Sequence, residues 1–322
     1  MKVRPLDRRL QFVTGKGGVG KTTTAAALAL LLARRGRRTL AVEMDAAGRL
    51  PALLGGTVSS VPQEVRPGVH VLTVEGRAAL EEYLGMIIPV KRLLSSVFSS
   101  RVYQYFVAAA PGLKELMTVG KIAYETTRDD GGRPLWDAVV VDAPATGHGL
   151  QYLRMPQAAM ETFGAGLVQR EAKRIVGLLR DPSMTAVHLV TLAEDMPVTE
   201  SLEARTELTE RLGLPLGHVV VNRVHDRRFA PATVERLGTE AHRSTGATRA
   251  LLECVAARAA EESGWSEINA EQLVRLRGAF GDVVTLPFLF LEEFDDRGVE
   301  ELSRVLEHAI GGARPAAARR AR

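Results

Sequence analysis

The sequence of 322 residues contains one cysteine, Cys254. A single thiol cannot form a disulfide within the chain, and it cannot supply the cysteine ligands of a zinc site or an iron–sulfur cluster. Electron transfer through such a cluster is therefore excluded unless Cys254 lies at a dimer axis, which its helical context disfavours. The scarcity of cysteine fits a reducing compartment, so we expect a cytoplasmic protein.

Aromatic residues and long apolar runs are also scarce. Aromatic side chains make up 5% of the chain, and the run of about 18 apolar residues that a transmembrane helix needs does not occur. Residues 1–10 lack the apolar stretch of a signal peptide. The net charge is only +4, and the composition predicts a disordered basic tail over residues 312–322. Charge by itself does not indicate a nucleic-acid partner.

Apolar strands that alternate with amphipathic helices are abundant. Segments such as LQFVTG, WDAVVVDAP and GHVVVNRV are separated by helical stretches rich in Ala, Leu and Arg. Several of these strands are too apolar to face water. The pattern predicts one α/β domain over residues 1–322, with a mostly parallel sheet and helices on both of its faces.

Two stretches interrupt this alternation, and we expect them to form a small helical subdomain. They span residues 78–130 and 155–180. In the first, apolar residues recur at the spacing of one helical face, namely Leu80, Tyr83, Leu84, Ile87 and Ile88. Such stripes either pack against one another and the sheet, or form a moving apolar surface that binds a partner.

The segment GKGGVGKT has the pattern of a phosphate loop, because it follows a strand and opens a helix. Its glycines allow backbone N–H groups to surround phosphates, and the helix N-terminus adds positive charge. Lys21 would reach the β- and γ-phosphates, Thr22 would bind Mg²⁺ and Thr23 would donate to the α-phosphate. The sequence thus predicts ATP and Mg²⁺ as ligands, held by Gly15, Gly17, Gly18, Val19, Gly20, Lys21, Thr22 and Thr23.

This loop carries two lysines, although lysine is rare in the chain. Only 7 of the 42 basic residues are lysine, yet Lys16 and Lys21 lie five positions apart. An ammonium group differs in shape from a guanidinium fork, so the arginine bias elsewhere indicates that both sites need a lysine. Two ammonium groups on one loop repel each other, and bound phosphates or those of a facing subunit would relieve that repulsion.

The stretch GKGGVGKTT resembles the deviant Walker A loop of the SIMIBI nucleotide-binding proteins. These include the partition and division-site ATPases, the nitrogenase iron protein and the ArsA/Get ATPases. The resemblance implies that Lys16 reaches across a nucleotide-dependent dimer, formed by two copies of the chain or by the chain and a paralogue. There it would act like an arginine finger, which contributes on the order of 10³–10⁵ in rate.

Asp45 ends the strand RTLAVEMD, where open α/β sheets place their ligands. In the ArsA/Get group the corresponding Asp orients or deprotonates the attacking water, so the resemblance assigns that catalytic role to Asp45, beside Lys16 and Lys21. The Pro and His that follow in the family are absent here, which leaves the switch geometry open. Alternatively Asp45 caps a helix or binds a water of the metal ion, and Glu43 competes for a role.

The segment WDAVVVDAPATGHG resembles the Walker B strand and switch II of the same group. Asp142 would hold Mg²⁺ together with Thr22. The switch II residues would be Pro144, Thr146 and Gly147, with Gly147 near the γ-phosphate. His148 could be a general base, but a hydrogen bond that stabilises the switch is the favoured interpretation.

Further segments extend the resemblance from about residue 11 to about residue 307. In VVVNRV, the family's Asn bonds adenine, a role that falls on Asn222. In LPFLFLEEFDD, Pro287 and Phe288 would contact the same base. The likeness is closest to the short, single-repeat bacterial ArsA-like ATPases.

The resemblance implies a dimeric, Mg²⁺-dependent ATPase that couples its nucleotide state to an unidentified protein client or membrane partner, with peripheral membrane contact through that partner. The single cysteine argues against the family's metalloid site, and the missing C-x-x-C pair argues against its dimer zinc. The alternative is a positioning ATPase that assembles on DNA or membrane. That alternative is disfavoured, because the last amphipathic helix is acidic and only the short tail is basic, and DNA is not expected as a partner.

Overall fold

The computed structural model describes residues 3–45, 47–87, 112–162 and 166–310. Residues 88–111 of the predicted helical subdomain and the predicted basic tail lie outside these residues. The strands are β1 (Leu10–Gly15), β2 (Thr39–Met44), β3 (Gln63–Arg66), β4 (Val69–Val74), β5 (Asp129–Asp130), β6 (Arg133–Pro134), β7 (Ala138–Asp142), β8 (Thr185–Leu192), β9 (Leu216–Val224) and β10 (Val283–Pro287).

Helices alternate with these strands along the chain. They are the 3₁₀ turn η1 (Pro5–Asp7), α1 (Lys21–Arg34), α2 (Arg49–Leu53), α3 (Gly76–Ile87), α6 (Leu113–Thr127), α7 (Thr146–Thr162), α8 (Leu167–Arg180), α9 (Asp195–Thr206), the π-helical turn η2 (Glu207–Arg211), α10 (Pro231–Arg243), α11 (Gly246–Phe280) and α12 (Asp296–Ile310). No helix within the described ranges is long and apolar enough to cross a membrane.

The main sheet has the strand order β10-β9-β8-β1-β7-β2-β4-β3. Every neighbouring pair is parallel except β3 and β4, which are antiparallel. Strands β1, β2 and β7 are buried along their whole length, as parallel strands covered on both faces must be. The prediction of an α/β fold with a mostly parallel sheet is confirmed.

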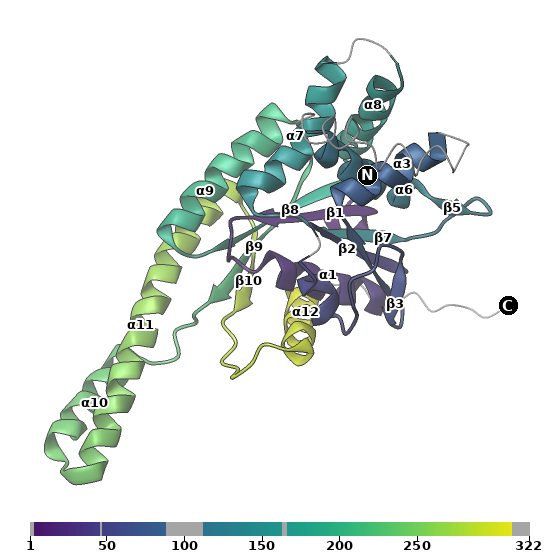
Figure 1. Ribbon diagram of the computed structural model, residues 1–322. Helices are drawn as coiled ribbons and strands as arrows, with labels where there is room; N and C mark the ends of the chain where they lie inside the picture. Colours follow the sequence, from purple (N-terminus) through teal and green to yellow (C-terminus); the bar gives the residue numbers. More distant parts are fainter. Residues whose placement is uncertain (1–2, 46, 88–111, 163–165, 311–322) are drawn as a thin grey trace, which may run out of the picture.

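Helices cover both faces of the sheet (Figure 1). On one face, α1 and α12 pack together in a core that includes the Ala- and Leu-rich side of α1. On the other face, α3, α6, α7 and α8 pack around a second core. Leu80 of the predicted stripe is buried in that second core, whereas the side chains of residues 83–111 lie outside the described part.

A helical hairpin projects from the sheet, and the sequence pattern did not predict it. Helix α10 packs against the far half of the 35-residue α11, and the near half of α11 runs along α9 (Figure 1). Its root is fixed at the ends of two strands, because Asn269 accepts the His225 backbone N–H at 2.8 Å and donates to the Ala193 carbonyl at 3.0 Å. An ion pair of 2.6 Å between Arg275 and Asp195 joins α11 to α9.

Strand β8 carries a buried histidine, His188. Its Nε2 faces Gln11 Oε1 at 3.0 Å, and its Nδ1 accepts the backbone N–H of His218 at 3.0 Å. A second proton on Nδ1 would break the bond to His218. Burial is the main cause that lowers the pKa of His188 to about 3, and His218 and Arg8 add to it. The ring is therefore neutral in the folded protein.

We predict that His188 makes stability depend on pH. Between its folded pKa of about 3 and its ordinary value near 6.5, the unfolded chain binds a proton that the folded chain does not. The free energy of unfolding should therefore fall by about 1.4 kcal/mol per unit as pH drops through that window. Urea unfolding at several pH values measures this dependence. The free energy of unfolding of His188→Asn should change less steeply with pH than that of the wild type, and equal pH slopes in the wild type and the variant would contradict the prediction.

Candidate functional site

The phosphate loop joins the end of β1 to the start of α1, and two of its glycines are required by geometry. Gly20 caps α1 with φ of 92°, and a Cβ there would collide with the Asn222 amide. Gly15 ends β1 beside the Val190 carbonyl, which a Cβ would also strike. The loop can therefore lie close to β8 and β9 only because these positions lack side chains.

A cavity of about 720 Å³ lies at this loop, at the carboxyl edge of the sheet. Within it, Lys21 Nζ donates to the backbone carbonyl of Lys16 at 2.9 Å. Burial lowers the pKa of Lys21, and the Asp142 carboxylate opposes that shift. The cavity is lined by Gly18, Gly20, Lys21, Thr22, Thr23, Arg49, Ala52, Leu53, Gly55, Arg223, Phe294, Asp295 and Asp296.

Asp142 ends β7 beside this loop and is 6% exposed. Its Oδ1 is buried and has no hydrogen-bond partner within the described part of the chain. Burial raises the pKa of Asp142 to about 7, with Glu43 adding to the rise, while the Thr22 hydroxyl and Lys21 lower it. A buried carboxylate oxygen without a partner, beside a threonine hydroxyl, fits the oxygen ligands that Mg²⁺ prefers.

Glu43 and Asp45 have different roles at the end of β2. Glu43 is buried, and its carboxylate accepts backbone N–H groups at the start of α2, from Gly48 and Arg49 at 2.8 Å and from Leu50 at 3.1 Å. Glu43, not Asp45, therefore caps that helix. Asp45 is exposed at φ of 64°, and its Oδ1 accepts the Tyr152 hydroxyl of α7 at 2.6 Å.

Lys16 is paired within its own chain. Its Nζ lies 2.5 Å from Glu200 Oε1 of α9, and both side chains are about one-third exposed. On the neighbouring helix, Arg154 of α7 bonds Glu207 at 2.7 Å. Of the predicted switch II residues, Pro144 lies between β7 and α7, whereas the side chains of Thr146 and His148, like the surroundings of Gly147, lie outside the described part.

Asn222 lies beneath the loop, 4% exposed, and its Nδ2 donates to the Val19 carbonyl at 2.9 Å. This contact ties β9 to the loop, and adenine recognition by Asn222 stays a prediction. The next residue, Arg223, has φ of 52° and lines both the phosphate-loop cavity and a second cavity.

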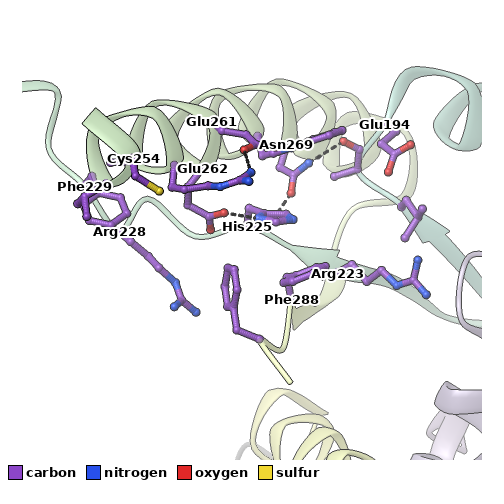
Figure 2. A pocket seen from close by; sticks show the side chains of 17 residues that line it. Glu194, Arg223, His225, Arg228, Phe229, Cys254, Glu261, Glu262, Asn269 and Phe288 are labelled. Carbon is purple, nitrogen blue, oxygen red and sulfur yellow. Dashed lines mark hydrogen bonds and ion pairs between the residues drawn. The ribbon is translucent and has the colours of Figure 1, made fainter. Parts of the chain in front are cut away.

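The second cavity, of about 670 Å³, opens between the strand ends and α11 (Figure 2). His225 lies near its centre, stacked on Phe288 with ring centroids 4.5 Å apart and paired with Glu262 of α11 at 2.9 Å. Trp265 and Phe290 complete the aromatic wall. The predicted Phe288 thus lines this cavity, whereas Pro287 ends β10 and lines neither cavity.

The structure brings together the predicted loop, Asp142 and Asn222, and it adds residues that the sequence pattern did not indicate. Arg223 could have been noticed, because it directly follows Asn222. Glu200, Tyr152 and Glu262 could not, because each meets its partner only through contact between elements distant in the chain.

Comparisons with known proteins show which family the chain resembles. The family described as anion-transporting ATPase matches residues 8–170, which include the phosphate loop, Asp45 and Asp142. ATPase BagA of Mycobacterium tuberculosis is 38% identical over 224 residues, which cover 67% of this chain and 65% of BagA. The arsenical pump-driving ATPases of Escherichia coli and Acidiphilium multivorum are 29% and 28% identical, each over 66% of this chain and 39% of their own length.

The match therefore spans less than two thirds of the length of these relatives. It confirms the ArsA-type resemblance, and it does not favour the alternative of a positioning ATPase on DNA or membrane. On the family match and the phosphate-loop fold together, the chain belongs to the anion-transporting ATPase family.

Proposed function

We propose that the chain binds and hydrolyses ATP with Mg²⁺, and that a dimer of it couples nucleotide state to a protein client or membrane partner. One observation carries the proposal. The glycine loop, Lys21, Thr22 and the Asp142 oxygen that has no partner among the described residues converge at the carboxyl edge of a parallel sheet, where such folds bind ligands. The names of the relatives, all ATPases, agree with it.

The phosphates would occupy the 720 Å³ cavity. The loop's backbone N–H groups and the N-terminus of α1 would face them, and Lys21 would exchange its bond to the Lys16 carbonyl for phosphate oxygens. Arg49 and Arg223 add positive charge to the cavity wall. Together with Lys21 they supply three cationic groups for the phosphates, while Asp295 and Asp296 add two carboxylates to the same lining.

Thr22 and Asp142 would hold the metal ion, which when bound supplies positive charge against the β- and γ-phosphate oxygens. Asp45 would accept the hydrogen bond of the attacking water and take up its proton as the γ-phosphoryl group transfers. Because Glu43 is engaged by three backbone N–H groups, it is not free for that role.

The base would enter the second cavity. Arg223 lines both cavities, so one nucleotide can lie with its phosphates in the first and its base in the second. Phe288, already stacked on His225, offers an aromatic face. Asn222 lines neither cavity and donates to the Val19 carbonyl, so it would support the loop beneath the nucleotide, and its contact with adenine stays a prediction.

Lys16 would reach the nucleotide of a second subunit, and this requires that its pair with Glu200 break. A pair this exposed contributes only about 0–1 kcal/mol. The negative charge of a facing triphosphate would outweigh it. Glu200 thus pairs with Lys16 until a nucleotide-loaded partner subunit binds. We propose that the protein acts in the cytoplasm.

We predict that Asp45→Asn binds ATP normally but hydrolyses it about 10²–10⁴-fold more slowly, the range typical of a lost general base. Phosphate release and equilibrium binding of a non-hydrolysable ATP analogue would measure the two effects. Asp282→Asn, an exposed change at the opposite edge of the sheet, is the control. Unchanged turnover in Asp45→Asn would refute the role of Asp45, whereas a wild-type protein that does not bind ATP would refute the function.

We predict opposite effects on ATP-dependent association for the two members of the Lys16–Glu200 pair. In an Asp45→Asn background, Lys16→Ala should abolish the dimer seen by sedimentation velocity, and Glu200→Gln should tighten it up to about 5-fold, because it frees the lysine. Glu203→Gln, also on α9, is the matched control. Normal association and turnover in Lys16→Ala would show that Lys16 has no role across a dimer.

We predict that Phe288→Ala weakens ADP binding about 5–150-fold, since stacking of a base on an aromatic ring contributes about 1–3 kcal/mol. Binding of tripolyphosphate should be unchanged, because that ligand lacks a base. Calorimetric titration of the two ligands gives the comparison. Equal weakening for both would place the base outside the second cavity.

A further inference from the structure

We infer that Tyr152 is a positioning residue for Asp45, and that its hydroxyl lets α7 control the carboxylate that activates water. The inference rests on the role proposed for Asp45. Its basis is the 2.6 Å hydrogen bond from the Tyr152 hydroxyl to Asp45 Oδ1, between residues 107 positions apart.

Asp45 needs such a partner to adopt one orientation. It follows the last residue of β2, its side chain is exposed, and its φ of 64° is rare for a residue with a side chain. Its backbone N–H is held by the Val74 carbonyl at 3.2 Å. An exposed aspartate held only through its backbone would sample several rotamers, so a short, charge-assisted bond decides its orientation.

Tyr152 is suited to provide that bond, because its ring is fixed. It is 9% exposed and belongs to the core that α6, α7 and α8 form on one face of the sheet. With Oδ1 accepting the Tyr152 hydroxyl, the second carboxylate oxygen of Asp45 keeps all of its lone pairs available for water. The fixed ring of Tyr152 thereby sets the orientation of the Asp45 carboxylate.

The hydroxyl acts only as a donor. Burial, and then the hydrogen bond and charge of Asp45, raise the pKa of Tyr152 above its ordinary value. The phenol therefore keeps its proton and cannot itself take one from water. Its contribution to hydrolysis is to hold Asp45, which is why we assign it a positioning role.

The position of Tyr152 on α7 gives the bond a second consequence. Helix α7 begins at Thr146, shortly after Asp142 ends β7, so its first turn contains the predicted switch II residues Thr146 and Gly147. Tyr152 lies six residues into this helix. A shift at the start of α7 would move the hydroxyl and with it Asp45, which couples phosphate sensing to water activation.

Tyr152→Phe tests the inference, because it removes the hydroxyl and keeps the ring. We expect kcat for ATP to fall about 10–100-fold, the effect of losing a hydrogen bond to a charged group, with KM changed less than about 2-fold. Turnover is normalised to the stoichiometry of ADP binding, so that a misfolded fraction does not enter kcat. Tyr124→Phe, on the exposed side of α6, should keep wild-type turnover.

A double-mutant cycle separates positioning from a general structural effect. In an Asp45→Asn background, Tyr152→Phe should lower turnover no further. Wild-type kcat in Tyr152→Phe, or the same fold loss in both backgrounds, would overturn the inference while leaving the proposed function intact. Wild-type turnover in Asp45→Asn alone would overturn both the role of Asp45 and the inference built on it.

Discussion

The site depends on the parallel register of three neighbouring strands, β1, β7 and β2. In that register Val13 lies opposite Asp142, and Asp142 lies opposite Glu43. Neighbouring strands are about 4.8 Å apart, so the phosphate loop, the carboxylate proposed to bind the metal ion and the end of β2 all lie within two strand spacings. Each strand is buried along its length, and this burial keeps the register from slipping.

Charged groups at this edge of the sheet have partners from within the chain. Lys16 is paired with Glu200 and Asp45 with Tyr152, and Lys21 donates to the carbonyl of Lys16. Asp142 differs, because one of its oxygens is buried without a partner in the described chain. The nucleotide would therefore exchange existing contacts of Lys16 and Lys21, whereas the metal ion would meet the open oxygen of Asp142.

At the second cavity, helix α11 supplies the partners of the polar groups. Its Asn269 and Glu262 bond the backbone and ring of His225, the residue on which Phe288 stacks. The hairpin is therefore rooted on the strand ends that line the proposed base site. A ligand that displaced these aromatic rings would change the contacts of α11, which projects from the body of the protein (Figure 1). Nucleotide binding could in this way alter the surface that the hairpin offers to a partner.

Local pattern in the sequence was enough to predict the alternating strands and helices, the phosphate loop and the strand ends that carry Asp45 and Asp142. Such features are encoded by neighbouring residues, through glycine geometry and apolar periodicity. The pattern did not predict the hairpin, the contact of Glu200 with Lys16 across 184 positions or that of Tyr152 with Asp45 across 107. These pairs follow from how α7 and α9 pack against the sheet, and because many side chains satisfy the same local pattern, only the tertiary structure decided which of them meet.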